Sequence, residues 1–133
     1  MLPFLSSIVL LSNLNVVVID PGHGGRQPGA VAADGTQEKG IALAVSLRLA
    51  RYLKAKTKAR VLLTRRNDRT LSLQQRAEMA NRLQADVFVS IHANASTRVG
   101  ARGVETYFLS SRATDRRARL LAARENFELI ESK

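Results

Sequence analysis

The sequence has no cysteine and few aromatic residues, and each of these absences excludes a class of site. With no cysteine among its 133 residues, the chain forms neither a disulfide nor a thiolate metal site. Cysteine usage therefore does not indicate whether the protein works in an oxidising or a reducing compartment. Aromatic residues make up 5% of the chain, which argues against binding of single-stranded nucleic acid on aromatic platforms. A metal site in this chain would therefore need histidine and carboxylate ligands.

Basic residues are also missing from the first part of the chain, where Arg26 is the first. A secretion signal needs a positively charged start, so the apolar residues 1–15 make a poor signal. The same stretch is too short to span a membrane. We interpret residues 1–15 as an apolar lead-in or an edge element, and residues 16–133 as one domain.

Beyond that stretch, positive charge predominates. The chain has 21 Lys and Arg against 11 Asp and Glu, a net charge of +10 and a sequence pI of about 11.2. This surplus predicts attraction to polyanions, but it does not choose among nucleic acid, anionic lipid and the anionic polymers of a cell envelope. The charges are spread along predicted helices, where a solvated face is the ordinary explanation. A basic nucleic-acid-binding domain therefore stays open as an alternative.

The only two histidines follow two runs of β-branched and apolar residues. His23 comes shortly after the run at residues 16–19, and His92 comes directly after the run at residues 87–91. Such runs predict buried strands, which are typical of parallel sheets. Functional groups in these sheets lie beyond the carboxyl ends of the strands. If the two strands are parallel, both imidazoles lie at one sheet edge, where they could share a metal ion.

Strands and helices are expected to alternate along the chain. We predict strands at residues 16–20, 60–64, 86–91 and 103–109, helices at 38–56, from 72 to about 83 and at 113–131, and a Gly-rich loop at 22–40 that includes a short strand near 30–33. This order is typical of βαβ units. It predicts an α/β fold in which a mainly parallel, twisted sheet is flanked by helices in three layers.

Two of these helices carry specific signals. Ser72 and Gln75 have the spacing of a capping box at the start of the second helix. Apolar residues at helical spacing predict the buried stripes. For the first helix they are Ile41, Val45, Leu49 and Tyr52, and for the second they are Leu73, Ala77, Ala80 and Leu83.

Glu38 is the best third ligand beside His23 and His92. It starts the helix that follows the first strand, so it is expected at the same sheet edge. Catalytic zinc often takes two histidines, one carboxylate and water, and a site of net charge about +1 favours ionisation of that water. Taken singly, a histidine in a Gly-rich turn is usually a surface residue, and a glutamate at a helix start usually compensates the helix dipole. Their joint placement favours a zinc site.

Several motifs occur in order through most of the chain. They are VIDPGHGG at 18–25, PGA at 28–30, EK at 38–39, LTR at 63–65 with Asp68, Leu73 with Arg76, AN at 80–81, AD at 85–86, SIHANA at 90–95 and GVETYFL at 103–109. On these stretches the chain resembles the zinc-dependent N-acetylmuramoyl-L-alanine amidases often called amidase type 3, which trim bacterial peptidoglycan.

The resemblance implies a function and a location. It assigns one Zn²⁺ to His23, Glu38 and His92, the set already reached from sheet geometry. It implies hydrolysis of the amide bond between N-acetylmuramic acid and L-alanine, in cell-wall remodelling or daughter-cell separation. Peptidoglycan is the expected partner, nucleic acid is not expected, and the location implied is the periplasm or the cell exterior.

The resemblance also shows where this chain departs from the family. Family members carry a later strand with a second glutamate, in a Glu-x-Gly-Phe-like context, that serves as the general base. No such segment occurs in this sequence, so we expect the catalytic domain at 16–133 to be incomplete at its C-terminal end. Glu105 is the nearest substitute. A catalytically weak or inactive fragment that binds zinc or cell wall therefore stays open as an alternative.

The remaining polar residues near the motifs receive secondary roles. We expect Asn94 to hydrogen-bond substrate and Asp20 to orient His23, although local turn hydrogen bonds would explain both equally well. Arg65, Asp68 and Arg76 are interpreted as a structural ion-pair set.

The predicted helix at 113–131 has a strongly basic first half. A packing helix with a solvated face is the ordinary explanation. It is also similar to an inserted helix that covers the zinc in division-linked family members, where a protein activator would act.

Overall fold

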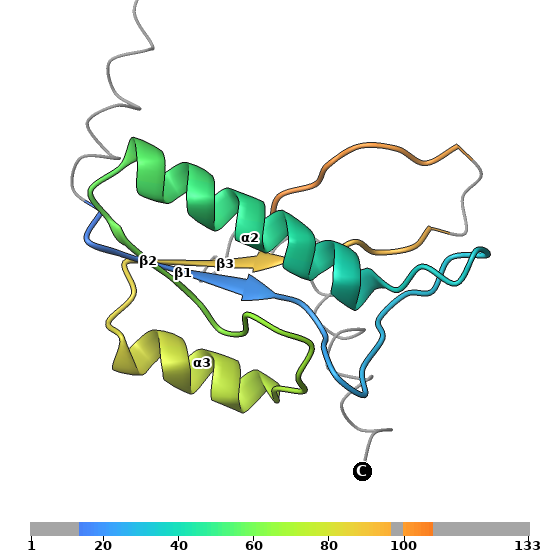
Figure 1. The fold of residues 1–133 in the computed structure, drawn as a ribbon, viewed down its shortest axis with the longest axis horizontal. Coiled ribbons are helices and arrows are strands. Elements are labelled where there is room, and N and C mark those ends of the chain that lie inside the picture. The colour runs from blue at the N-terminus through green and yellow to red at the C-terminus, as the bar shows by residue number, and fades with distance from the viewer. Residues whose placement is uncertain (1–13, 97–99, 108–133) are drawn as a thin grey trace, which may run out of the picture. The chain divides into compact units, whose positions relative to one another are not determined.

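The structure is a computed structural model that describes residues 14–96 and 100–107. Its elements are β1 (Val16–Pro21), α2 (Glu38–Lys56), β2 (Arg60–Leu63), α3 (Leu73–Arg82) and β3 (Val87–Ile91). The strand order is β2-β1-β3, and β1 pairs with both neighbours in parallel. Figure 1 shows α2 and α3 on opposite sides of this sheet. The predicted α/β fold with a mainly parallel sheet between helices is confirmed.

The central strand β1 carries most of the buried apolar run. Val18 pairs with Leu62 on one side and with Phe88 on the other, so both edges of β1 are hydrogen-bonded. Val18 and Ile19 are completely buried. One core cluster joins β1 to β2 and α2, and its buried members are Val17, Ile19, Ala50, Ala59 and Val61. A continuous apolar strand is therefore explained by burial on both faces, as in other parallel sheets.

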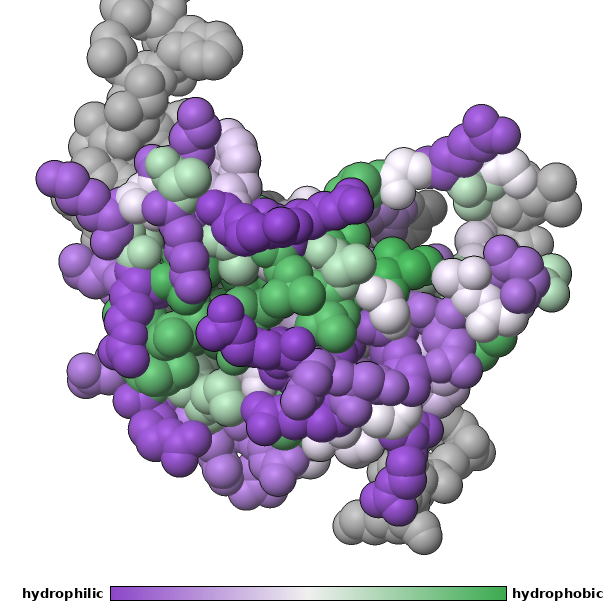
Figure 2. All heavy atoms as spheres, viewed as in Figure 1, coloured by the Kyte–Doolittle hydropathy of each residue, from purple (hydrophilic) through white to green (hydrophobic). Residues whose placement is uncertain are grey.

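Helix α2 has the predicted bounds but turns a different face to the sheet. Its buried residues are Glu38, Ala42, Ser46 and Ala50, which follow each other at intervals of four and therefore lie on one face of the helix. The predicted stripe was wrong at Ile41, Val45 and Tyr52, which are 42%, 45% and 61% exposed. Small side chains allow the helix to lie close to the sheet, and this close approach outweighs the burial of larger apolar groups. Figure 2 shows hydrophobic surface open to solvent in the middle of the face that is drawn, bordered by hydrophilic side chains.

Helix α3 begins at the predicted capping box. The Ser72 hydroxyl accepts a hydrogen bond from the Gln75 amide at 3.1 Å, and the Gln75 side chain accepts one from the Ser72 amide at 2.9 Å. Its buried residues are Arg76 and Ala80. The stripe was therefore right at Ala80 and wrong at Leu73, which is 42% exposed, and at the exposed Ala77. A charged residue takes the buried position because it has an ionic partner there.

Two short predicted strands are corrected. Residues 103–107 form no strand, and Val104 is 95% exposed. β-branched residues form a strand only where another strand offers a hydrogen-bonding edge, and within the described ranges no strand pairs with this segment. Near 30–33 the structure has a single antiparallel bridge between Val31 and Gln37.

The chain divides into two compact units, Met1–Ala95 and Ser96–Lys133. Most of the predicted lead-in and the predicted helix at 113–131 lie outside the described residues. No helix in the described part of the chain has the length and apolar character needed to cross a membrane.

Candidate metal centre

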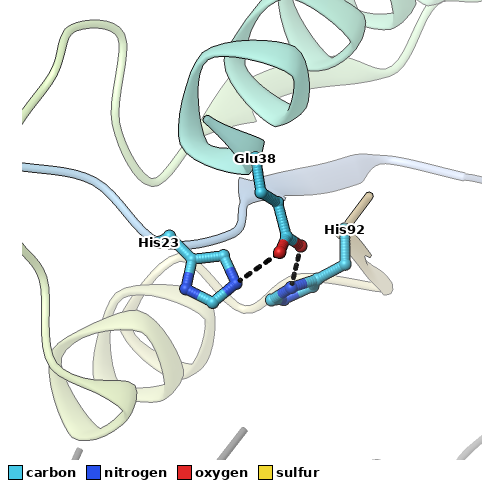
Figure 3. A group of neighbouring side chains, drawn as sticks. All are labelled: His23, Glu38 and His92. Atoms are coloured by element: carbon cyan, nitrogen blue, oxygen red, sulfur yellow. Dashed lines mark hydrogen bonds and ion pairs between the residues drawn. The ribbon is translucent and has the colours of Figure 1, made fainter. Parts of the chain in front are cut away.

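Two strand ends and one helix start meet at the carboxyl edge of the sheet. His23 follows β1, His92 follows β3, and Glu38 is the first residue of α2. The two strands end at the same level because Pro21 pairs with Ile91, and the Gly22 amide donates to the Ile91 carbonyl at 2.9 Å. Figure 3 shows the Glu38 carboxylate directed from the helix start toward the two imidazoles.

The three side chains approach each other closely. Glu38 Oε2 lies 3.3 Å from His23 Nε2, and Glu38 Oε1 lies 3.1 Å from His92 Nδ1. The imidazole rings are 4.9 Å apart between centroids and nearly perpendicular, at 81°. One ligand atom from each residue lies within 4.8 Å of the others. The structure therefore brings together all three residues that the sequence predicted to share a sheet edge.

These distances suit a tetrahedral metal ion. Zinc bonds of about 2.1 Å at tetrahedral angles place neighbouring ligand atoms about 3.4 Å apart. The separations of 3.1 and 3.3 Å are close to that value but run to different oxygens of Glu38, and one ligand atom from each of the three residues lies within 4.8 Å of the others. Two imidazole nitrogens and one carboxylate are also the donor set that catalytic zinc commonly takes. The residues present thus fit a zinc ion in their chemistry, and they lie close enough together to share one ion.

Glu38 is held in its charged form by its surroundings. Burial alone would raise the pKa of Glu38, since a charged carboxylate loses hydration there. The adjacent imidazoles of His23 and His92 and hydrogen bonds from the backbone amides of Ala30 and Ala93 outweigh this effect, and the pKa lies well below its ordinary value. The two amides lie 2.9 and 2.8 Å from the carboxylate. The group is therefore an anion at neutral pH, as metal binding requires.

Two glycines, because they have no side chain, make room for the imidazole rings. A Cβ atom on Gly22 would lie 2.5 Å from the His92 ring. One on Gly29 would lie 2.6 Å from the His23 ring and 2.7 Å from Glu38, and the φ of Gly29 is +67°. Sequence analysis placed both glycines in motifs without finding this role. The available signal was their position close to predicted ligands.

The other predicted site residues are Asp20, Asn94 and Glu105. Asp20 accepts hydrogen bonds from Thr64, Ser90 and Arg76, and Arg76 also donates to the His23 carbonyl, so Arg76 links Asp20 to the His23 backbone. Two further residues are exposed: Asn94, which follows His92 by two positions, and Glu105, which belongs to the second unit and accepts a hydrogen bond from Tyr107.

The predicted ion-pair set is structural, but its pairs differ from those expected. Arg76 pairs with Asp20 and Lys39 pairs with Asp68, each at 2.7 Å. Arg65 donates instead to backbone carbonyls, including those of Pro21 and Gly22. Sequence analysis had no signal for these partners, because they come together only when the loops fold.

Comparison with known proteins identifies the family of this chain. The family model of N-acetylmuramoyl-L-alanine amidases matches residues 17–131. The chain belongs to this amidase family. It is 39% identical over 112 residues to the amidase AmiC of Neisseria meningitidis, covering 84% of this chain and 27% of that protein. It is 41% identical over 113 residues to AmiA of Escherichia coli, covering 84% and 38%.

Solved amidase structures show the same fold. The catalytic domain of CwlV from Bacillus (Paenibacillus) polymyxa superposes with a TM-score of 0.62 at 45% identity, covering 66% of this chain and 50% of that one. AmiC2 of Nostoc punctiforme gives 0.59 at 44% identity, covering 63% and 47%. This chain of the amidase family therefore aligns with about half of each solved chain, and it spans 27% and 38% of the two curated relatives.

Proposed function

We propose that this chain holds one zinc ion between His23, Glu38 and His92. We further propose that it belongs to the catalytic part of an enzyme that hydrolyses the amide bond between N-acetylmuramic acid and L-alanine in peptidoglycan. The observation that carries this proposal is the meeting of the three side chains within 4.8 Å, in a chain of the amidase family.

The residues of this centre have different roles in the proposed reaction. Zinc bound by such a set lowers the pKa of a water molecule and polarises a carbonyl oxygen. Glu38 supplies the negative charge, and the amides of Ala30 and Ala93 fix its orientation. The His23 side chain is 6% exposed, whereas the His92 side chain is 23% exposed. We therefore expect substrate to approach from the His92 side, where Asn94 would hydrogen-bond to it.

One role of the proposed mechanism has no assigned residue. Family resemblance places the general base in a segment for which this sequence has no match, and Glu105 lies in the second unit. A positioned base commonly contributes about 10²–10⁴-fold in rate. Within the described residues, Glu38 is the only carboxylate in the group of candidate ligands, and this supports a second candidate function, a zinc-binding or cell-wall-binding fragment with weak or no turnover.

Metal content tests the proposed centre. We expect the purified chain to contain stoichiometric zinc by elemental analysis and His92→Ala to lose most of it, because one of three protein ligands is gone. Glu78→Ala, an exposed change on α3, is the matched control and should keep the metal. Unchanged zinc content in His92→Ala would remove His92 from the site.

Release of muropeptides from purified peptidoglycan separates the two candidate functions. Turnover that a chelator abolishes would support the amidase and reject the inactive fragment. Stoichiometric zinc without turnover would support the fragment. Salt-sensitive binding to DNA together with no bound zinc would overturn both and favour a basic nucleic-acid-binding domain.

Location and regulation follow from the proposed substrate. An enzyme acting on peptidoglycan works in the cell envelope, in the periplasm or outside the cell. The CwlD amidase of Clostridioides difficile, which superposes with a TM-score of 0.61 at 33% identity and covers 65% of this chain, was solved in complex with the GerS lipoprotein. For this chain we propose a protein activator that acts on residues 113–131, which lie outside the described part.

A further inference from the structure

The backbone at His23 adopts a conformation that most residues avoid. Its φ is +57°, in the left-handed region, where a side chain with a Cβ meets steric resistance. Such conformations persist only when surrounding contacts hold them, and they are concentrated at functional sites. The surroundings of His23 should therefore show what keeps it there.

Two arginines bind the peptide groups on either side of His23. Arg65 Nη2 donates to the Gly22 carbonyl at 2.7 Å, and Arg76 Nη2 donates to the His23 carbonyl at 2.7 Å. The first carbonyl belongs to the peptide group before His23 and the second to the peptide group after it. Together the two hydrogen bonds restrict both φ and ψ of His23.

Arg65 also joins this loop to the helix that carries Glu38. Its side chain is fully buried; Nη2 donates to the Lys39 carbonyl at 2.9 Å, and Nε donates to the Pro21 carbonyl at 3.0 Å. Lys39 directly follows Glu38 in the first turn of α2. One rigid guanidinium group thus sets the spacing between the segments of two metal-ligand candidates.

Arg76 is anchored from the opposite side of the sheet. Its Nη1 lies 2.7 Å from both the Asp20 carboxylate and the Pro21 carbonyl, and its side chain is 5% exposed. Asp20 in turn accepts hydrogen bonds from Thr64 and Ser90. The anchor therefore reaches the chain just beyond β2 and into β3.

We propose that Arg65 and Arg76 are positioning residues that hold His23 in its left-handed conformation at a set distance from Glu38. Neither arginine needs to touch the metal, yet both control how well the ligands are arranged before it binds. This inference rests on the proposed metal centre. Lysine cannot replace the planar fork, because a single ammonium group does not reproduce its divergent donors.

Zinc affinity in the full chain is the first test. We expect Arg65→Lys and Arg76→Lys each to raise the zinc dissociation constant about 10–100-fold, as outer-shell changes commonly do, measured by competition with a chromogenic chelator. Val61→Ala is the matched control, since Val61 is equally buried but packs in the core cluster. It should lower stability and leave the affinity of the folded chain unchanged. Parental affinity in Arg65→Lys, or equal weakening in Val61→Ala, would overturn the proposal.

Amide exchange in the metal-free chain gives a second, independent readout. The amides of Ala30 and Ala93 donate to Glu38, so displacement of this carboxylate should speed their exchange relative to the amides of β1. We expect this local change in Arg65→Lys but not in Val61→Ala. Unchanged exchange would reject the positioning role.

The two measurements distinguish failure of the proposed metal centre from failure of the proposed positioning role. If the parent chain binds no zinc, the metal centre fails, while the exchange result still decides whether the arginines position Glu38 and His23. If Arg76→Lys does not fold because Asp20 loses its partner, Arg65→Lys carries the test, because it leaves that pair intact.

Discussion

The two histidines of the candidate metal centre are held in unequal ways. His23 is buried, its backbone is left-handed, and arginines bind the carbonyl groups on both sides of it. The His92 side chain is 23% exposed and contacts Glu38 at a strand end. The comparison teaches that the centre has a prearranged half and an adjustable half, which share one carboxylate. Substitutions on the first side should cost stability as well as metal affinity, whereas those on the second should cost mainly metal affinity.

The largest effect on zinc affinity is expected where both halves meet. Glu38→Ala removes the shared carboxylate and leaves the Ala30 and Ala93 amides without their acceptor. We expect zinc affinity to fall by about 3 kcal/mol, or roughly a hundredfold, as one of three protein ligands is lost. Calorimetric zinc titration measures this. Glu78→Ala should bind zinc as the parent does, and equal binding by Glu38→Ala would contradict the site.

On the His23 side, Arg76→Met should cost the most stability. It leaves the Asp20 carboxylate buried without its ionic partner, which typically destabilises a protein by about 3–5 kcal/mol. Urea unfolding measures the loss. Ser90→Ala removes a neutral hydroxyl donor from the same carboxylate and should cost less, about 1.5–3 kcal/mol. Similar losses in the two variants would show that the Arg76 pair does not stabilise this half.

The two glycines sharpen the comparison directly. Alanine at Gly29 would meet the buried His23 and Glu38 in a left-handed backbone, so Gly29→Ala should lose stability, about 1–3 kcal/mol. Alanine at Gly22 would meet the His92 ring, which can move outward. We expect Gly22→Ala to lose less stability and to bind zinc about tenfold more weakly. Urea unfolding and zinc titration check both, and equal stability losses would argue against an adjustable half.

The smallest effect is expected on the pH dependence of stability, through Asp68, which accepts a hydrogen bond from the Gly25 amide in the loop after His23. Hydrogen bonds from the Lys39 ammonium and the Gly25 amide lower the pKa of Asp68 below its ordinary value. A lowered folded-state pKa means that the stabilisation is present above the unfolded pKa, about 3.9, and is lost as the pH falls through the folded value. Asp68→Asn should be slightly less stable than the parent at pH 7. The difference in unfolding free energy between the parent and Asp68→Asn should shrink as the pH falls below about 4. A difference that stays constant with pH would contradict this.

Much of the fold could be predicted because its signals are local. The β-branched run that became β1 and the capping box at Ser72 each depend on neighbouring residues only. The grouping of His23, Glu38 and His92 was also within reach, since parallel strands end at a common edge. The buried face of α2 was not, because close packing of Ala42 and Ser46 on the sheet competed with the more apolar Val45.

The amino-acid sequence by itself determined where β1, α2, β2, α3 and β3 lie, and therefore which edge of the sheet carries the two imidazoles and the carboxylate. Local backbone preference and periodic hydrophobicity are sufficient for that. Only the tertiary structure decided that Arg65 and Arg76 hold the His23 backbone, and that residues 103–107 stay outside any strand. These outcomes depend on partners more than 30 residues away in the chain, and a buried guanidinium group or a strand edge is satisfied only by groups that folding brings within hydrogen-bonding distance.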